Sequence, residues 1–575
     1  MTSPLPFSRE PALEALRGTT FDLLVVGGGV TGAGVLLDAS ARGMKAALVE
    51  KGDFAVGTSS KSSKLVHGGL RYLLSARDYG LVHEALVERQ RLLANAPHLV
   101  SPLPFLIPLF GRDGAVNKSV AKVYSTGLWG YDVIGGLRIG RRHRRIGREE
   151  ASRMVPTLRT DRLVAGFVYW DARADDARLT LTLARSAVLD HGGVAVNHAP
   201  MAGVLRDGSG QVSGVRLGPS DLGGGPPTDG LEIRAGVVVN AGGVWSDEVR
   251  QLTEGKYPDT IRPAKGVHIT LPYEKLPTEV AVVLPVPKDR RSVFVVPWGQ
   301  RVYVGTTDTD YTGRLEDPQC TGEDIRYLLD AVNASVSSPV SESDILGSWA
   351  GLRPLIKAAA TERTADLSRR HAVTTSADGL VTVTGGKLTT YRRMAADAVD
   401  AAQSVLRSSG GGSVGGWSGG SQAGSSGGRR RSPTKRLRLH GAVDPAALTS
   451  TLAGTTGQEA AEHLASRHGT DAWQVLALMT ERPELSEPLV AGLPYLAAEA
   501  VWAVRAEMAR TLEDILSRRT RALILDREAT AAAAPTVAAL VAPELGWSES
   551  ETAAETARFL ALVDEERRAG AVSPA

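Results

Sequence analysis

Residues 21–53, FDLLVVGGGVTGAGVLLDASARGMKAALVEKGD, decide the fold of this 575-residue chain. Residues 23–26 are a short apolar run rich in β-branched side chains, which predicts a buried strand. Glycines follow at once, and residues 30–42 carry leucines among small residues, a pattern typical of a helix. Gly43 ends this helix where glycine is favoured, and residues 45–49 predict a second strand. The stretch is therefore a complete β-α-β unit.

The glycines of this unit are spaced as in a nucleotide-binding turn. Gly27, Gly29 and Gly32 form G-x-G-x-x-G between a strand and a helix, where they allow a tight turn and a close approach to a pyrophosphate. Glu50 lies 18 residues after Gly32, and its carboxylate can accept hydrogen bonds from an adenosine ribose. An acid at this position argues against a 2′-phosphate, so NAD and FAD remain. The alternative is an ordinary glycine turn in an α/β domain.

The rest of the chain favours FAD over NAD. Instead of further β-α units, the chain enters a polar stretch, GTSSKSSKLVHGGLRY at 57–72, and returns late to the nucleotide fold. Residues 237–248 (VVVNAGGVWSDE) and 381–391 (VTVTGGKLTTY) each end a strand in paired glycines, which would bring the backbone close to a cofactor. A helix beginning near Lys387 would direct its positive end at the edge of a flavin where negative charge gathers on reduction.

Composition indicates an ordinary globular protein of more than one domain. Lys and Arg number 66 against 63 Asp and Glu, a balance too even to indicate nucleic-acid binding. The single cysteine, Cys320, excludes an intramolecular disulfide and a cysteine metal cage, and we predict no metal site. Without a signal-peptide pattern or an apolar run of about 18 residues, we expect a cytoplasmic protein with no membrane span.

The C-terminal part differs in composition from the rest. Residues 408–431 form a Ser/Gly tract that runs into arginines, which predicts a flexible linker. Alanine, leucine, glutamate and arginine dominate thereafter. Residues 495–525 predict a helix with one apolar stripe, made of Val501, Val504, Met508, Leu512 and Ile515. We therefore expect an α-helical C-terminal domain.

Seven segments carry a resemblance to one known family: GGGVTGAGVLLDASARG, TSSKSSKLVHGGLRYL, KGVHI, VPWG, GTTD, GLRPL and GGKLTTYR. Together they are similar to the FAD-dependent, quinone-linked glycerol-3-phosphate dehydrogenases over residues 15–400, and RRTR at 518–521 resembles their helical cap domain. The resemblance implies oxidation of sn-glycerol 3-phosphate to dihydroxyacetone phosphate, with FAD as cofactor, a quinone as acceptor and a homodimer. A glycerol-3-phosphate oxidase that reduces O₂ to H₂O₂ is the alternative.

The implied fold is α/β: a glutathione-reductase-like FAD domain, an inserted substrate domain of mixed, largely antiparallel sheet, and an all-α C-terminal domain. We expect FAD-binding segments at 15–105, 181–250 and 376–407. The helical and loop region at 106–180 begins the substrate domain, which continues at 251–375. The linker occupies 408–433 and the helical domain 434–575.

A small dianion with a secondary alcohol needs cations for its phosphate and a base for its hydroxyl proton. Arg353 in GLRPL is the first phosphate candidate, because its planar fork matches two phosphate oxygens. Further candidates for the substrate are the cations Arg71 and Lys387 and the hydroxyl donors Tyr72 and Thr307. His268 in KGVHI is the first choice for the base.

His67 is the second choice for the base. The resemblance implies that its loop runs beside the flavin ring, so His67 is also a cofactor candidate. The full set of predicted cofactor residues is Gly27, Gly29, Thr31, Gly32, Glu50, Thr58, Ser59, Ser63, Leu65, His67, Gly242, Gly386, Lys387, Leu388 and Thr389.

Two basic runs, RRHRRIGR at 141–148 and GRRRSPTKRLR at 428–438, are either solvated surface or sites of attachment to anionic lipid. The apolar stretch SPLPFLIPLF at 101–110 is predicted to dip into a membrane interface. No aromatic interleaving accompanies the basic runs, so we predict no nucleic-acid binding. A basic scaffold that binds lipid or nucleic acid without chemistry is the hypothesis from outside the enzymes.

Overall fold

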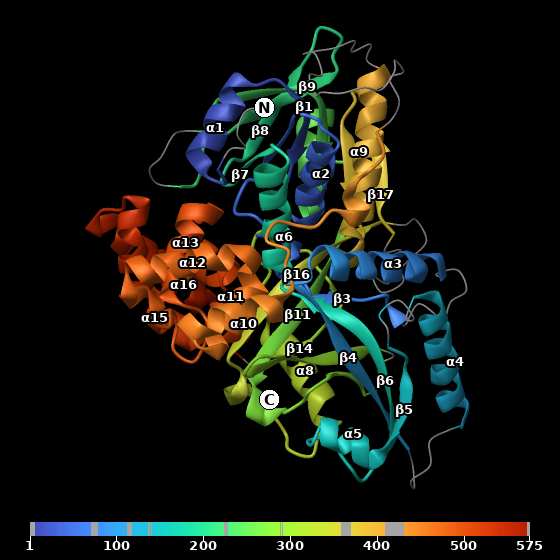
Figure 1. The fold of residues 1–575 in the computed structure, drawn as a ribbon. Coiled ribbons are helices and arrows are strands. Elements are labelled where there is room, and N and C mark those ends of the chain that lie inside the picture. The colour runs from blue at the N-terminus through green and yellow to red at the C-terminus, as the bar shows by residue number, and fades with distance from the viewer. Residues whose placement is uncertain are drawn as a thin grey trace.

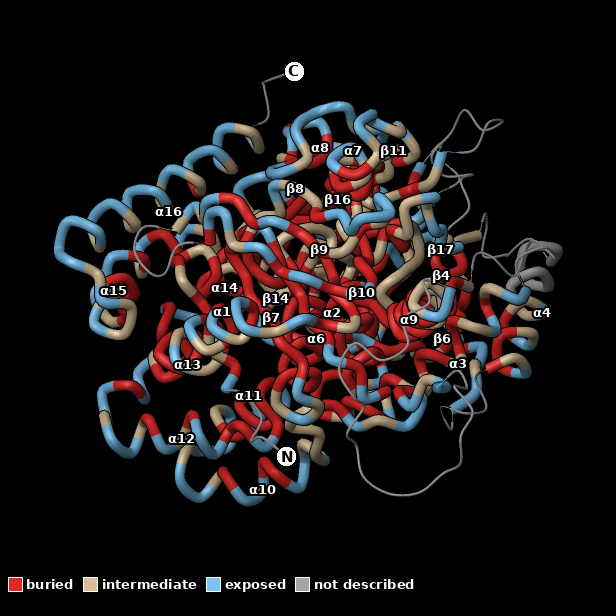
Figure 2. Tube along the Cα trace, turned by 90° about the horizontal axis from the view of Figure 1, so that it is seen from above, coloured by how far each residue is buried: buried red, intermediate tan, exposed pale blue. Residues whose placement is uncertain are grey.

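The computed structural model describes residues 6–70, 79–111, 118–135, 139, 141–222, 228–287, 289, 291–357, 370–408 and 430–571, with the backbone alone for 118–124. Two β-sheets lie one above the other, and the C-terminal helices pack beside them (Figure 1). The buried segments gather along the two sheets, whereas the outer turns of the C-terminal helices are exposed (Figure 2).

The first sheet is the nucleotide-binding sheet, with eight strands in the described residues and a path β17-β18-β10-β1-β2-β7. Its five central strands, from β18 to β7, run parallel, so their carboxyl ends meet at one edge of the sheet. The strands are β1 (Phe21–Val26), β2 (Ala46–Val49), β7 (Val194–Val196), β8 (Met201–Arg206), β9 (Val212–Leu217), β10 (Glu232–Asn240), β17 (Ala372–Thr375) and β18 (Val381–Thr384).

The second sheet has ten strands in the described residues, most of them antiparallel. The largely antiparallel sheet expected for the substrate domain is confirmed; β13 and β14, for example, form a hairpin on either side of Gly299. The strands are β3 (Leu65–Val66), β4 (Val100–Phe110), β5 (Arg144–Gly147), β6 (Leu163–Ala174), β11 (Ile261–Pro272), β12 (Ala281–Pro285), β13 (Ser292–Trp298), β14 (Arg301–Gly305), β15 (Thr309–Asp310) and β16 (Gly347–Ile356).

Helices cover both sheets. On the first sheet, α2 follows β1 and packs against α6 and α9; on the second, α8 covers one face and the C-terminal segment the other. The helices that accompany the sheets are α1 (Arg9–Gly18), α2 (Val30–Ala41), α3 (Tyr79–Asn95), α4 (Lys118–Ile134), α5 (Arg148–Met154), α6 (Asp176–Arg185), α7 (Ser246–Glu254), α8 (Gly322–Asn333) and α9 (Tyr391–Ser408). None of the described helices is long and apolar enough to cross a bilayer.

The stretch SPLPFLIPLF was predicted to dip into a membrane interface, and this prediction is wrong. The stretch forms β4, which pairs with β12 on one side and β6 on the other. Leu103, Phe105 and Leu106 are buried. Among the described residues, β12 pairs with β4 only at Phe105 and Leu106, so Pro102 and Pro108 lie where that side of the strand has no strand partner, a position that tolerates proline.

The C-terminal domain is helical, as expected. Its helices are α10 (Pro445–Thr456), α11 (Gln458–His468), α12 (Ala472–Glu481), α13 (Ala497–Glu507), α14 (Ala522–Leu525), α15 (Arg527–Leu545) and α16 (Glu549–Gly570). The single helix predicted over 495–525 is wrong, because α13 ends at Glu507 and Met508 adopts a left-handed backbone with φ 58°. The break turns the segment 510–521 toward the first sheet, where it contacts residues near the end of β2.

Candidate functional site

A cavity lies at the edge of the first sheet where the parallel strands end. It is bounded by the turns that follow β1, β2, β10 and β18. Ten of the predicted cofactor residues line it: Gly27, Gly29, Thr31, Glu50, Thr58, Ser59, Gly242, Gly386, Lys387 and Leu388. Ligands of open α/β sheets bind at this edge, so the position suits a nucleotide cofactor.

The turn after β1 has the geometry that its glycines predict. Gly27 has φ 113°, and a Cβ atom there would lie 2.6 Å from the carbonyl oxygen of Ala241. A Cβ atom at Gly32 would overlap the carbonyl oxygen of Gly27, so the first turn of α2 packs directly on the glycine turn. Because no side chain intervenes, a pyrophosphate can approach the backbone N–H groups at the start of α2.

Glu50 closes the turn from the second strand. Its two carboxylate oxygens accept hydrogen bonds from the backbone N–H groups of Gly28 (2.6 Å) and Gly52 (2.8 Å). Burial raises the pKa of the Glu50 carboxyl, and the hydrogen bonds from Gly52 and Gly28 oppose that rise. The side chain is thereby fixed at the cavity wall, where a carboxylate fits the ribose of an adenosine.

The residues present fit FAD at this cavity: a glycine turn for the pyrophosphate, Glu50 for the ribose, and a second glycine turn at 385–386 beside Lys387. The sequence reasoning missed the turn after β7, from which Ala199, Pro200 and Met201 line the cavity. A signal was present in the short apolar run Val194–Val196, which is typical of a buried strand; this strand is parallel to β2, so its end reaches the same edge.

Five predicted cofactor residues do not line this cavity. Gly32 lies within α2, and Leu65 is buried in β3. The backbone N–H of His67 donates to Thr389 Oγ1 at 3.1 Å, which ties the loop 57–70 to the turn before α9. Ser63 instead contacts His268, the predicted base, with 2.8 Å between Ser63 Oγ and His268 Nε2.

His268 lies in the middle of β11, stacked on Trp349 of β16 with ring centroids 4.6 Å apart and planes at 6°. The opposite residue on β14 is Gly305, and a Cβ atom there would overlap the imidazole. Its Nδ1 has no hydrogen-bond partner among the described residues. The ring is thus held by stacking and by Ser63 at one nitrogen.

The imidazole of His268 is neutral at pH 7. Burial lowers its pKa well below the usual value of 6.5, and the cations Lys64 and Arg353 lower it further. A neutral imidazole can accept a proton from a hydroxyl group, which a protonated ring cannot do.

Arg353 of β16 is the second predicted site residue near this point. Its guanidinium donates to Asp308 Oδ1, Thr306 Oγ1 and the carbonyl oxygen of Thr307, each at 3.2 Å. The next residue, Pro354, lines the cofactor cavity. Arg353 pairs with Ala264 across β11 and β16, and its guanidinium lies over Gly266 of β11, where a Cβ atom would overlap it.

Thr307 also meets this cluster through its side chain, since Thr307 Oγ1 accepts from the backbone N–H of Val267 at 3.1 Å. The structure therefore brings His268, Arg353, Thr307 and Ser63 together, with Lys387 on the neighbouring cavity wall. Arg71 and Tyr72 lie outside the described residues, and their assignment stays a prediction.

Lys64 is a charged neighbour of the site that the sequence reasoning missed. Its ammonium lies 4.3 Å from the centroid of Trp349 and 3.4 Å from Asp176 Oδ2, and the residue is 1% exposed. Burial lowers the pKa of Lys64 to about 8, although Asp176 opposes that change. A lysine in a serine-rich loop gives no sign of burial in the sequence.

The cavity lies at a glycine turn on a parallel sheet, and a buried histidine and an arginine of the antiparallel sheet lie beside it. This arrangement defines the class of the protein, which is an FAD-dependent oxidoreductase. The family described as "FAD dependent oxidoreductase" matches residues 22–392. A second family, the "C-terminal domain of alpha-glycerophosphate oxidase", matches residues 432–552.

Two similar proteins and one similar structure indicate which family of FAD-dependent oxidoreductases the chain belongs to. The glycerol-3-phosphate dehydrogenase of Mycobacterium leprae is 40% identical over 98% of this chain and 91% of its own. The mitochondrial glycerol-3-phosphate dehydrogenase of Mus musculus is 37% identical over 97% of this chain and 76% of its own. The structure of the Bacillus halodurans glycerol-3-phosphate dehydrogenase complexed with FAD has a TM-score of 0.74 and 30% identity, covering 98% of this chain and 97% of that one. The chain belongs to the family of FAD-dependent glycerol-3-phosphate dehydrogenases.

Proposed function

We propose that the protein oxidises sn-glycerol 3-phosphate to dihydroxyacetone phosphate and passes the electrons to a quinone. The observation that carries this proposal is the 2.8 Å contact between His268 and Ser63, because it joins a neutral base to the loop that borders the cofactor cavity. The names of the full-length relatives support the substrate.

The substrate hydroxyl gives its proton to His268. Nε2 is the nitrogen that faces the loop, so we assign the proton to this atom, with Ser63 Oγ as its neighbour. FAD, when bound, supplies the acceptor for the hydride that leaves the same carbon. The neutral ring of His268 suits this role, because loss of hydride and loss of the hydroxyl proton together give the ketone.

The phosphate of the substrate is held by cations. Arg353 lies within the cluster and its guanidinium plane is fixed by hydrogen bonds to four protein oxygens, which supports it as the principal anchor. Lys387 adds charge from the cavity wall. We assign Arg71 and Tyr72 to complete the phosphate site and Thr307 to donate a hydroxyl group to the substrate. His67 is assigned to contact with the flavin ring.

The reductive half-reaction tests this function. Purified protein should be yellow, and glycerol 3-phosphate added without oxygen should bleach it, whereas glycerol should not. His268→Ala should slow the bleaching by at least about 100-fold, because it removes the general base. Release of H₂O₂ without added quinone would instead favour the oxidase, the alternative from the same scaffold.

His143→Ala is the matched control, because His143 pairs with Asp132 and precedes β5, which pairs with β6 toward the other end of the second sheet from β11. It should bleach at the wild-type rate. If His268→Ala bleaches normally and His67→Ala does not, His67 is the base and the assignment above is wrong. A colourless protein would contradict the proposed function altogether.

We also propose that the protein docks on an anionic membrane surface, where its quinone dissolves. The surface around β5 supports this: Arg142, Arg144 and Arg145 line one hollow with Trp129, whose side chain is 53% exposed. Together these residues are called the β5 surface below. The second basic run is less suited, since Arg430 donates to the carbonyl oxygen of Arg42 on the FAD domain. A homodimer remains a proposal from the family resemblance.

A further inference from the structure

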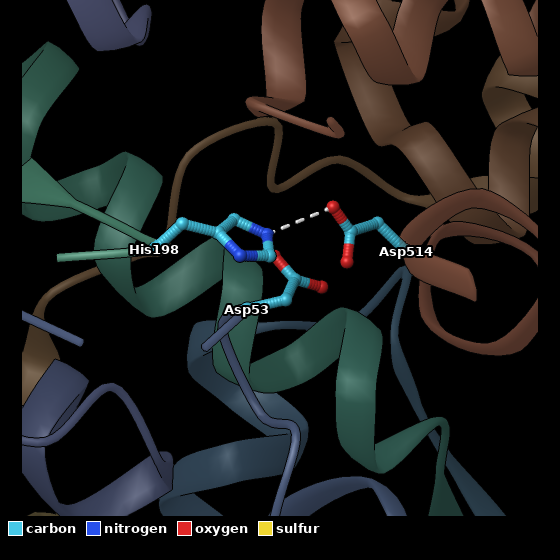
Figure 3. A group of neighbouring side chains, drawn as sticks. All are labelled: Asp53, His198 and Asp514. Atoms are coloured by element: carbon cyan, nitrogen blue, oxygen red, sulfur yellow. Dashed lines mark hydrogen bonds and ion pairs between the residues drawn. The ribbon is translucent and has the colours of Figure 1, made fainter. Parts of the chain in front are cut away.

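Three buried acid and imidazole groups from distant parts of the chain meet behind the cofactor cavity. Asp53 follows β2, His198 follows β7, and Asp514 comes from the C-terminal domain (Figure 3). His198 Nε2 lies 3.1 Å from Asp514 Oδ2. One polar side-chain atom from each of the three residues lies within 4.8 Å of the other two.

Two arginines of the C-terminal domain neutralise these acids. Asp53 accepts from Arg518 Nε at 2.7 Å and from both terminal nitrogens of Arg519 at 2.6 and 2.7 Å. Asp514 accepts from Arg518 at 2.6 Å. The set could be mistaken for a metal site, but guanidinium groups already occupy both oxygens of Asp53 and Oδ1 of Asp514, and two backbone N–H groups donate to Oδ2 of Asp514. It is a buried ion network across a domain interface.

The network is one hydrogen bond away from the wall of the cofactor cavity. The backbone N–H of His198 donates to the carbonyl oxygen of Gly52 at 2.6 Å, and that of Ala199 donates to the carbonyl oxygen of Glu50 at 2.7 Å. Glu50 and Ala199 both line the cavity. The turns after β2 and β7 therefore form one rigid unit, with the cavity on one side and Arg518 and Arg519 on the other.

We propose that Arg518 and Arg519 are positioning residues for the adenosine end of FAD, so that docking of the C-terminal domain and binding of the cofactor are coupled. This rests on the proposed function, because it assumes FAD in the cavity. The arginines act through Asp53: they fix the turn 50–53, which holds the Glu50 carboxylate toward the ribose. Coupling is reciprocal, so bound FAD also holds the C-terminal domain in place.

Arg519→Gln and Asp53→Asn test the coupling in the full-length protein. Asp53→Asn removes a buried charge and keeps the shape of the side chain, whereas Arg519→Gln removes a buried charge and leaves a shorter polar side chain. We expect the dissociation constant of FAD, measured by flavin fluorescence with the apoprotein, to rise at least tenfold in both variants. The increase in Tm on adding FAD should shrink in parallel, and Arg519→Lys should restore part of the affinity.

Arg185→Gln is the matched control, because Arg185 also forms a buried ion pair with the C-terminal domain, to Asp471 at 2.6 Å, but touches neither turn. It should lower the Tm of the apoprotein while leaving the FAD dissociation constant within about twofold. If all three variants weaken FAD equally, the network only holds the domains together. If none does, the coupling is absent, whereas failure of the wild type to bind FAD would overturn the proposed function instead.

Discussion

Two glycines shape the space around the proposed base and the proposed phosphate anchor. Gly305 lies opposite His268, and Gly266 lies beneath the Arg353 guanidinium, which reaches over from β16. A Cβ atom at either glycine would overlap that side chain. The backbone conformation does not require glycine at either position, since neither residue has a positive φ. Their role is to leave room, which makes them as necessary to the site as the groups they face.

Gly305→Ala should therefore slow the reduction of the flavin by substrate without loss of bound FAD. The added methyl group displaces the imidazole, and a shift of about 1 Å in a reacting group costs about 100-fold in rate. Stopped-flow reduction of the flavin by glycerol 3-phosphate should show this loss, with an unchanged flavin content.

Gly147→Ala on β5 is the comparison, because a Cβ atom there meets nothing within 4 Å. It should reduce its flavin at the normal rate. Full activity in Gly305→Ala would show that His268 does not need its present position.

Among the elements, β5 and α4 together present the surface proposed to meet the membrane. Val133 at the end of α4 is 68% exposed, close in sequence to the β5 surface and its arginines. Arg142→Glu combined with Arg145→Glu should weaken sedimentation with phosphatidylglycerol vesicles at least tenfold, since each basic charge contributes about 1 kcal/mol. Moderate salt should weaken the wild type in the same way.

Arg216→Glu combined with Arg234→Glu makes the same change of charge on the exposed edge of β9 and β10, outside the β5 surface. Vesicle binding should persist in that protein. Equal binding of the wild type to neutral phosphatidylcholine vesicles would contradict an electrostatic contact.

Elements with local signals were predictable, and elements decided by distant contacts were not. The β-α-β unit and the hairpin of β13 and β14 follow from patterns within a few residues. By contrast, the sequence of β4 predicts a segment at a membrane interface, because no pattern within the segment indicates that β6 and β12 flank it. The break at Met508 is similarly invisible, since its apolar side chain continues the helical stripe while its backbone leaves the helix.

For the candidate site, the sequence identified the residues that contact a ligand better than those that support them. The role of the spaced glycines and of Glu50 can be inferred from a pattern within a few tens of residues. Lys64, Asp53 and Asp514 do not, because their function depends on partners more than 100 residues away.

In the whole molecule, the interface between the first sheet and the C-terminal domain should be sensitive to alkali. Burial alone would lower the pKa of His198, but Asp514, Asp221 and Asp53 outweigh it and raise the pKa to about 10. In the unfolded chain the value is about 6.5. The imidazolium therefore adds stability that is fully present below about pH 6.5 and is lost as pH rises through 10.

His198→Asn removes this titration, and asparagine tolerates the φ of 48° at that position. Between pH 7 and 10 the Tm of the wild type should fall by several degrees more than that of the variant. Differential scanning fluorimetry measures both. Other groups titrate in this range in both proteins, so the difference isolates His198, and parallel curves would contradict the assignment.

The order of segments in the nucleotide-binding sheet has a consequence for synthesis of the protein. β1 pairs with β2 at once, but its other neighbour, β10, is translated more than 200 residues after β1, and β18 later still. The other neighbour of β2, β7, also follows only about 150 residues later, so at about 5–20 residues per second the nascent β-α-β unit waits on the ribosome with both edges open. We expect flavin capture to follow, because Lys387, Arg518 and Arg519 are translated well after the glycine turn. We therefore expect ribosome-bound chains to be shielded by chaperones and to be colourless until release.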